Sequence, residues 1–165
     1  MIVLAFALRL VALIVAGVAI FIVIGVVVHW LKGVRLRRRV RKEWAGRRVL
    51  LVYSNSPNWQ HYFESRWFPV LEPHIVKLNW SDRSSWRQDR NAVGPAVFRH
   101  YLGSREEFNP AAVVFMDRGQ VEIVRFWKAF RDYKHGKTAS LDEQQRRLED
   151  LLKMIGIVVE IPRPT

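Results

Sequence analysis

The chain has 165 residues, a length that favours one globular domain with appendages. Its seven Trp, nine Phe and four Tyr exclude an intrinsically disordered chain, because they are sufficient to fill a core. The absence of cysteine excludes disulfides, zinc–thiolate sites and thiol catalysis. The net charge of +12 is concentrated near the N-terminus, because from Ala45 onward only 19 basic residues face 14 acidic ones. The overall charge therefore does not favour nucleic acid as a partner.

The first predicted element is a transmembrane helix within residues 1–31. From Leu10 to Leu31 there are 22 residues without Lys, Arg, Asp or Glu. A helix of this length measures about 33 Å, against about 30 Å for the hydrocarbon core of a lipid bilayer. A cleaved signal peptide is the alternative, but its charge would precede a shorter apolar stretch. We therefore expect a signal anchor that spans the bilayer once.

A basic juxtamembrane collar is predicted at residues 32–46. Seven cations lie in eleven residues after the span, whereas Arg9 alone precedes it. The positive-inside rule then predicts a single-pass protein of the cell membrane, with its N-terminus outside and its C-terminal domain cytoplasmic. The collar is also expected to attract anionic lipid headgroups, although setting the topology is an equally good explanation for it. The cations are Lys32, Arg35, Arg37, Arg38, Arg39, Arg41 and Lys42.

Residues 47–165 are predicted to form a small three-layer α/β domain with a mixed sheet. A β-branched, Leu-rich run at Arg47–Ser54 and a second run at His74–Trp80 predict two strands. Between them, aromatic residues at helical spacing in residues 58–67 predict a helix that Pro69 kinks or ends. A polar segment with a short helix follows the second strand, and Ala96–Leu102 is predicted as another short helix.

The second half of this domain is predicted to begin with a hairpin. Strands at 111–116 and 121–126 are joined by a tight turn with Gly119 in the left-handed position. A helix is expected at 127–135, and Ser140 with Glu143 predicts a capping box for a last helix. Residues 157–161 are predicted as an edge strand.

This order of elements resembles the thioredoxin-like fold over roughly residues 47–155. Pro110 stands before the third strand, where that fold has its cis-proline, and Pro69 resembles the proline that kinks its first helix. The hairpin turn at 116–120 is also similar to that of the family. Residues 54–59 read Ser-Asn-Ser-Pro-Asn-Trp where the redox motif belongs, so the resemblance implies the scaffold without the activity. A small doubly wound domain is the alternative.

Candidate site residues follow the first two predicted strands. Ligands of α/β sheets bind beyond the carboxyl ends of parallel strands, so polar side chains there predict a binding pocket. Within it, His61 and Asp82 are the candidates for an acid or base. The competing explanation is that Asn, Ser and Asp at these places form turns and helix caps. The ligand-binding candidates are Ser54, Asn55, Ser56, Asn79, Ser81 and Arg83.

Two functional hypotheses remain open from the sequence. The first is a membrane-tethered, non-enzymatic module that binds a partner protein or the anionic membrane surface. The second is a membrane-anchored enzyme that uses the strand-end pocket. The sequence does not decide whether the protein is an enzyme. The five His residues show no metal-ligand spacing, and we expect neither a metal site nor a cofactor.

Overall fold

The computed structural model describes residues 2–89, 91–103 and 109–163. The chain divides into two compact units, Met1–Arg35 and Leu36–Thr165. Helix α1 (Ile2–Glu43) begins in the first unit and ends in the second. The structure is therefore α/β, with one long apolar helix at the N-terminus, as the sequence predicted.

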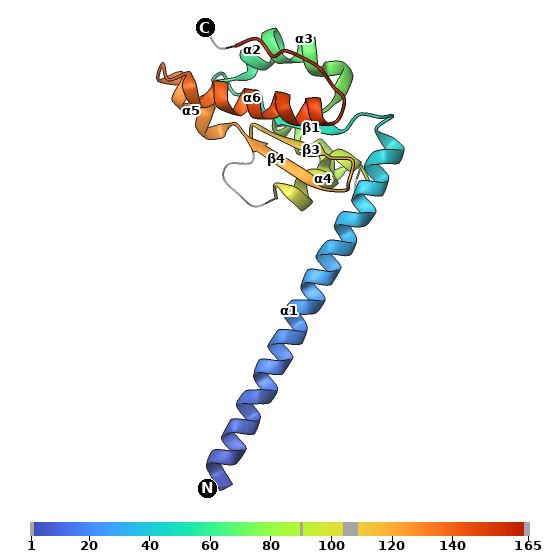
Figure 1. The fold of residues 1–165 in the computed structure, drawn as a ribbon, viewed down its shortest axis with the longest axis vertical. Helices are drawn as coiled ribbons and strands as arrows, with labels where there is room; N and C mark the ends of the chain where they lie inside the picture. The colour runs from blue at the N-terminus through green and yellow to red at the C-terminus, as the bar shows by residue number, and fades with distance from the viewer. Residues whose placement is uncertain (1, 90, 104–108, 164–165) are drawn as a thin grey trace. The chain divides into compact units, whose positions relative to one another are not determined.

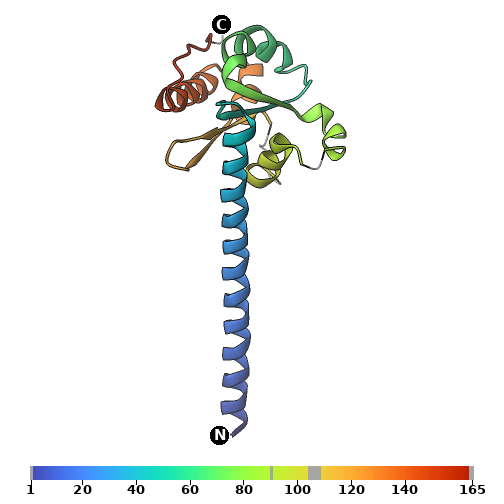
Figure 2. The ribbon, with the colours of Figure 1, turned by 90° about the vertical axis from the view of Figure 1, so that its right-hand side faces the viewer.

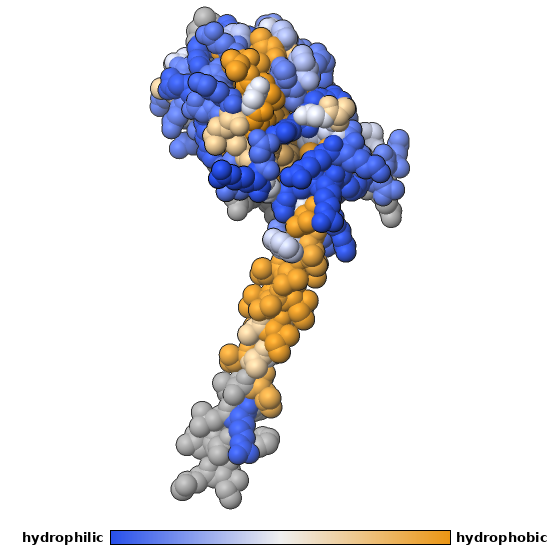
Figure 3. All heavy atoms as spheres, turned by 45° about the vertical axis from the view of Figure 1, so that its right-hand side comes forward, coloured by the Kyte–Doolittle hydropathy of each residue, from blue (hydrophilic) through white to orange (hydrophobic). Residues whose placement is uncertain are grey.

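The first unit consists of the apolar part of α1. Every side chain from Leu13 to Lys32 is exposed, including Phe21 at 77 % and Trp30 at 61 %. Figure 3 shows this part of the helix as an apolar surface. Within the described residues, α1 is the one helix long and apolar enough to cross a membrane. Apolar residues occupy all sides of this helix, a pattern found both in membrane-spanning helices and in helices buried in large protein cores.

The second unit is built around a mixed four-stranded sheet in the order β2-β1-β3-β4. Strand β1 (Val49–Tyr53) pairs in parallel with β2 (Ile75–Asn79), in a register that sets Tyr53 beside Asn79. Strand β3 (Ala111–Phe115) is antiparallel to β1, and β4 (Val121–Arg125) is antiparallel to β3. The two central strands are apolar throughout because both of their faces are covered.

One face of the sheet carries an aromatic core. It is covered by α2 (Gln60–Tyr62), α3 (Phe68–Leu71), α5 (Trp127–Lys134) and α6 (Ala139–Met154), which lie together in Figure 1. Because successive side chains of a strand point to opposite faces, this core takes Val49 and Leu51 from β1. Its largest fully buried side chains are Phe63, Trp67, Phe126 and Phe130.

The opposite face takes Leu50 and Val52 from β1 and is covered by α4 (Val93–Tyr101), visible in Figures 1 and 2. The C-terminal part of α1 contributes to the same core through buried Leu36 and Val40, and Trp44, the residue directly after α1, is buried beside them. Helices thus cover both faces of the sheet, and this part of the predicted three-layer arrangement is observed.

The helix predicted at residues 58–67 begins later and runs further than expected. It comprises α2, a π-helical turn at Phe63–Trp67 and α3, and a 3-10 turn at Glu72–His74 follows. Pro69 does not end it, because Pro69 lies in the first turn of α3, where a missing N–H costs nothing. The π-helical turn, closed by the Phe68 N–H to the Phe63 carbonyl, precedes that point.

The hairpin between β3 and β4 agrees with the prediction. Gly119 has φ +81°, and the Met116 N–H donates to the Gln120 carbonyl at 3.0 Å. The peptide bond between Asn109 and Pro110, just before β3, is cis. Helix α4 begins three residues before the predicted Ala96 and ends at Tyr101.

The capping box predicted at Ser140 is wrong. Helix α6 begins at Ala139 with Thr138 as its N-cap, and the Thr138 carbonyl accepts from the Leu141 and Asp142 N–H groups. Ser140 therefore already lies inside the helix.

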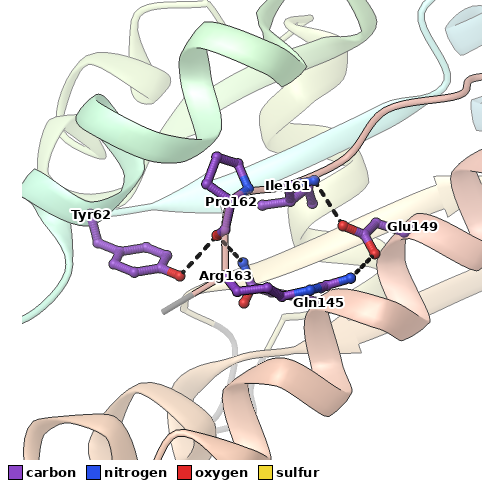
Figure 4. Close-up of polar contacts among 6 residues, drawn as sticks. All are labelled: Tyr62, Gln145, Glu149, Ile161, Pro162 and Arg163. Atoms are coloured by element: carbon purple, nitrogen blue, oxygen red, sulfur yellow. Dashed lines mark hydrogen bonds and ion pairs between the residues drawn. The ribbon is translucent and has the colours of Figure 1, made fainter. Parts of the chain in front are cut away.

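The edge strand predicted at 157–161 is also wrong, because this segment is irregular and pairs with side chains instead of a strand. The Ile161 N–H donates to Glu149 Oε1 at 2.8 Å, and Arg163 Nη2 donates to Glu149 Oε2 at 2.5 Å. The Pro162 carbonyl accepts from Gln145 Nε2 at 3.2 Å and from the Tyr62 hydroxyl at 3.4 Å. Figure 4 shows these contacts holding the tail between α2 and α6, with Ile161 fully buried. The apolar, β-branched sequence of residues 157–161 did not reveal that carboxylate and amide side chains take the place of a neighbouring strand.

Candidate functional site

The polar residues predicted to form a strand-end pocket are partly brought together. Asn79 Nδ2 donates to Asn55 Oδ1 at 2.8 Å, and the Asn55 N–H donates to Ser81 Oγ at 3.0 Å. The Ser81 N–H in turn donates to Asn79 Oδ1 at 3.0 Å. The parallel pairing of β1 with β2 places these three residues at one edge of the sheet, as expected. Their hydrogen bonds link the two loops to each other, which is the behaviour of turn-forming residues.

The other ligand-binding candidates also serve their own loops. Ser54 is buried, and its Oγ accepts from Trp59 Nε1 at 3.2 Å. The Ser56 carbonyl accepts from the Trp59 and Gln60 N–H groups and so starts the helix that follows. The Arg83 guanidinium lies 5.1 Å from the centre of the Trp80 ring, a cation–π distance.

His61 and Asp82, the candidate acid and base, are both exposed. A hollow of about 530 Å³ includes Ser81 and Arg83 in its lining, but neither His61 nor Asp82. The hollow is walled by aromatic and basic residues, and three of its rings stack edge-on or tilted at 5.1 to 5.6 Å. Its lining residues are Trp80, Ser81, Arg83, Ser84, Trp86, Phe98 and Arg99. A catalytic pairing of His61 with Asp82 stays a prediction.

One phenol near this edge has a raised pKa. Tyr53 ends β1, and burial raises its pKa above the ordinary value of 10.0. Nearby Lys77 opposes the shift, whereas Asp82, Glu64 and Glu72 add to it. The phenol therefore stays neutral to a higher pH than an ordinary tyrosine does. Among the described residues, no group of three or more His, Asp or Glu could hold a metal ion.

The collar has a structural role that the sequence analysis missed. Leu36, Val40 and Trp44 are 7 %, 2 % and 5 % exposed, and the Trp44 ring meets Phe115 edge-on at 5.7 Å. Their spacing of four residues places them on one side of a helix. The same spacing is present in the sequence, but the cations between these three residues made the segment look polar on all sides. Residues 36–44 are therefore part of the domain core rather than a free connection to it.

Burial of that apolar side determines where the collar cations lie. Lys32, Arg35, Arg38, Arg41 and Lys42 are exposed. Two others are half-buried and engaged by the domain. Arg37 Nη1 donates to the Tyr101 hydroxyl at 3.5 Å, while Arg39 Nε pairs with Glu43 at 3.0 Å and Arg39 Nη2 donates to the Asn91 carbonyl.

A second hollow, of about 370 Å³, lies where α1 leads into β1 and β3 leads into the hairpin turn. Because β3 is antiparallel to β1, this is the opposite end of the sheet from the predicted strand-end site. The turn into β1 is made by Ala45 (φ +48°) and Gly46 (φ +86°), and Arg47 Nε donates to the Trp44 carbonyl at 3.3 Å. The lining residues are Arg37, Val40, Arg41, Gly46, Arg47, Arg48, Phe115, Met116 and Asp117.

The charge around this second hollow is uneven. Four arginines line it against one carboxylate, and that carboxylate, Asp117, pairs with Arg48. In the described part of the chain, the side chains of Arg37, Arg41 and Arg47 have no carboxylate within 4.0 Å. Arg37 and Arg41 belong to the predicted collar, whereas Arg47 and Arg48 lie beyond its predicted end at residue 46.

Comparison with protein families, curated proteins and solved structures finds no match to this chain. The function is therefore argued from the two ends of the sheet and from α1.

Proposed function

We propose that the protein is a single-pass membrane protein whose α/β domain binds the anionic surface of the cytoplasmic leaflet. The observation that carries this proposal is the burial of Leu36, Val40 and Trp44 in the domain core. A collar on a flexible linker would present its cations in all directions. The part of the collar that is built into the domain instead presents Arg38, Arg41 and Lys42 from one helical surface, within eleven residues of the apolar span.

The electrostatic attraction is of a useful size. Near an anionic leaflet each cation contributes on the order of 1 kcal/mol, and the effect decays within a Debye length of about 8 Å. Such a range requires the cations to stay close to the lipid. The five exposed cations lie within 32–42, so chain connectivity alone keeps them near the end of the span.

The orientation rests on the same residues. Seven collar cations follow the span and Arg9 precedes it, which favours a cytoplasmic domain. A reporter enzyme active only outside the cell, fused after Thr165, should remain silent, whereas a reporter active only in the cytoplasm should work. The opposite pattern would reverse the orientation. Recovery of the intact chain in the soluble fraction would remove the membrane proposal altogether.

The scaffold that we propose for this domain is thioredoxin-like. The order β2-β1-β3-β4, with one parallel pair and two antiparallel pairs, supports it over a doubly wound sheet, which would be mostly parallel. Since the chain has no cysteine, such a scaffold would serve binding rather than thiol redox chemistry.

Fluorescence energy transfer tests surface binding in the full chain. Because the chain has no cysteine, Met154→Cys at a 68 % exposed position offers a single labelling site. The labelled protein is placed in nanodiscs with an acceptor on the lipid headgroups. Transfer should rise when phosphatidylglycerol is added to phosphatidylcholine, and the rise should vanish at high salt.

Matched charge variants make this experiment specific. The triple variant Arg35→Gln, Arg38→Gln, Lys42→Gln should lose most of the rise, because these exposed cations belong to the collar. Lys128→Gln, Lys134→Gln, Lys137→Gln removes the same charge from exposed positions in and after α5 and should retain it. Equal transfer in neutral and anionic nanodiscs would contradict surface binding and favour a partner protein. A soluble fragment starting at Ala45 is unsuitable, since it would lack three core residues.

A further inference from the structure

The arginine-lined hollow between the end of α1 and the hairpin turn is a candidate site of a different kind from the exposed collar surface. Arg37 and Arg41 lie one turn apart on α1, and Arg47 and Arg48 come from the start of β1. Arginine presents its N–H donors in a planar fork that matches the oxygens of a phosphate or carboxylate. The hollow has three more positive than negative side chains, and a bound anion would offset the repulsion among them.

The floor of the hollow is apolar. Val40 is 2 % exposed and Phe115 is 6 % exposed, and half-buried Met116 lies beside them. Free phosphate is polar on all sides and gains nothing from such a floor. An amphiphilic ligand, with a phosphate at the guanidinium groups and carbon atoms against the floor, matches both parts of the lining.

The position of the hollow along the chain also favours a membrane lipid. Arg37 is six residues beyond Leu31, so even an extended chain would keep it within about 20 Å of the end of the apolar span. A lipid headgroup is therefore permanently within reach, whereas a soluble ligand must arrive by diffusion.

We propose that this hollow binds the phosphomonoester headgroup of an anionic membrane lipid, with Arg37, Arg41 and Arg47 as its phosphate ligands. The proposal rests on the membrane-surface function above and names the chemistry that the surface is expected to select. A phosphomonoester carries about 1.5 to 2 negative charges and three terminal oxygens, which suits three guanidinium groups better than a diester with a single charge. The pair between Arg48 and Asp117 closes the hollow on the side of the hairpin turn.

Native mass spectrometry of the full chain in detergent micelles tests this proposal. Phosphatidic acid, phosphatidylglycerol and phosphatidylcholine are added separately, and one-lipid adducts are counted. Phosphatidic acid should bind on the order of tenfold more tightly than the diester phosphatidylglycerol, because one more charge-assisted contact is available. Glycerol phosphate, added as the soluble counterpart, should compete weakly. Competition equal to that of the lipid would overturn the assignment of a lipid as the ligand.

Two double variants separate the hollow from general charge attraction. Arg37→Gln with Arg41→Gln removes two cations that line the hollow, whereas Arg38→Gln with Lys42→Gln removes two from exposed positions at the same helical spacing. The first pair should remove the roughly tenfold preference for phosphatidic acid over phosphatidylglycerol. The second pair belongs to the collar surface and should weaken the binding of both lipids alike, so that this preference remains. Thermal unfolding of both variants checks that each remains folded.

A conservative variant tests whether the guanidinium geometry matters. Arg37→Lys with Arg41→Lys retains the charge but not the planar fork, so binding should fall between the wild type and the glutamine pair. Equal losses from the hollow pair and the exposed pair would overturn the hollow while leaving surface binding intact. No preference for anionic over neutral lipid in any variant would overturn both proposals.

Discussion

The apolar part of α1 and the α/β domain place their apolar side chains in opposite surroundings. From Leu13 to Leu31 every side chain is exposed, and apolar residues occupy all sides of the helix. In the domain, Phe63, Trp67 and Phe126 are fully buried by other parts of the chain. The changeover occurs within one helix, because Leu36 and Val40 of α1 already belong to the domain core, as does Trp44 directly after it. An apolar surface on all sides of a helix is the pattern expected of the proposed transmembrane segment, whereas a stripe at four-residue spacing packs against a protein surface.

The largest effect is expected from charge in the apolar part of α1. In the proposed transmembrane helix, Ile20→Arg with Val23→Arg should disfavour insertion by about 6 to 8 kcal/mol, because each central arginine costs about 3 kcal/mol or more. Membrane fractionation after alkaline washing measures the result. Ile20→Leu with Val23→Leu is the control and should stay in the membrane. Full retention of the arginine variant in the membrane fraction would contradict the proposed transmembrane helix, because membrane attachment would not depend on burying residues 20 and 23 in lipid.

The next largest effect is expected where α1 joins the core. Trp44→Ala should lower the free energy of unfolding of the domain by about 3 to 5 kcal/mol, because it leaves a cavity against Phe115. Lys42→Ala, at an exposed position near the end of α1, should change the free energy of unfolding by no more than about 0.5 kcal/mol. Urea unfolding of the full chain in detergent measures both variants. Equal stability of the two would mean that residues 36–44 are a linker after all.

The C-terminal tail offers a similar contrast within the domain. Ile161→Ala should cost about 2 to 5 kcal/mol, because Ile161 is fully buried. Val158→Ala, at an 84 % exposed position of the same tail, should be nearly neutral. Urea unfolding again serves as the measurement. A neutral Ile161→Ala would show that the tail is not part of the core.

The smallest effect is expected from a change of pH, and it concerns the α/β domain, where two tyrosines have raised pKa values. Burial raises the pKa of Tyr62 and of Tyr53, so the folded domain holds these protons more tightly than the unfolded chain does. Their contribution to stability is complete below the ordinary tyrosine pKa of about 10 and is lost as the pH rises through the folded values. Alkaline pH should therefore lower the melting temperature of the domain.

Phenylalanine variants test the origin of this alkaline loss. Tyr62→Phe should cost about 0.5 to 1.5 kcal/mol at neutral pH, because it removes the hydrogen bond to the Pro162 carbonyl. Combined with Tyr53→Phe, it should flatten the fall in melting temperature above pH 10. Circular dichroism at a series of pH values follows the change. An unaltered fall in the double variant would assign the pH dependence to other groups.

Much of the architecture was predictable from the sequence, because its signals are local. The apolar run from Leu10 to Leu31, the strands at β1 and β3 and the turn at Gly119 depend on residues adjacent in the chain. The meeting of Asn55 with Asn79 followed from parallel strands. Whether His61 and Asp82 act together was not predictable in the same way, because both side chains are exposed and are not positioned by packing.

What only the tertiary structure decided depends on contacts between distant residues. Residues 157–161 are β-branched and apolar as a strand would be, but the tail forms hydrogen bonds with Glu149 and Gln145 of α6 instead of with a strand. The arginine hollow needs the end of α1 and the start of β1 to meet the hairpin turn, although Arg37 and Asp117 lie about eighty residues apart in the sequence. The sequence by itself determined which segments are apolar and which are charged. Folding decided which charges surround a hollow, because the antiparallel pairing of β1 with β3 brings residues 37–48 close to residues 115–117.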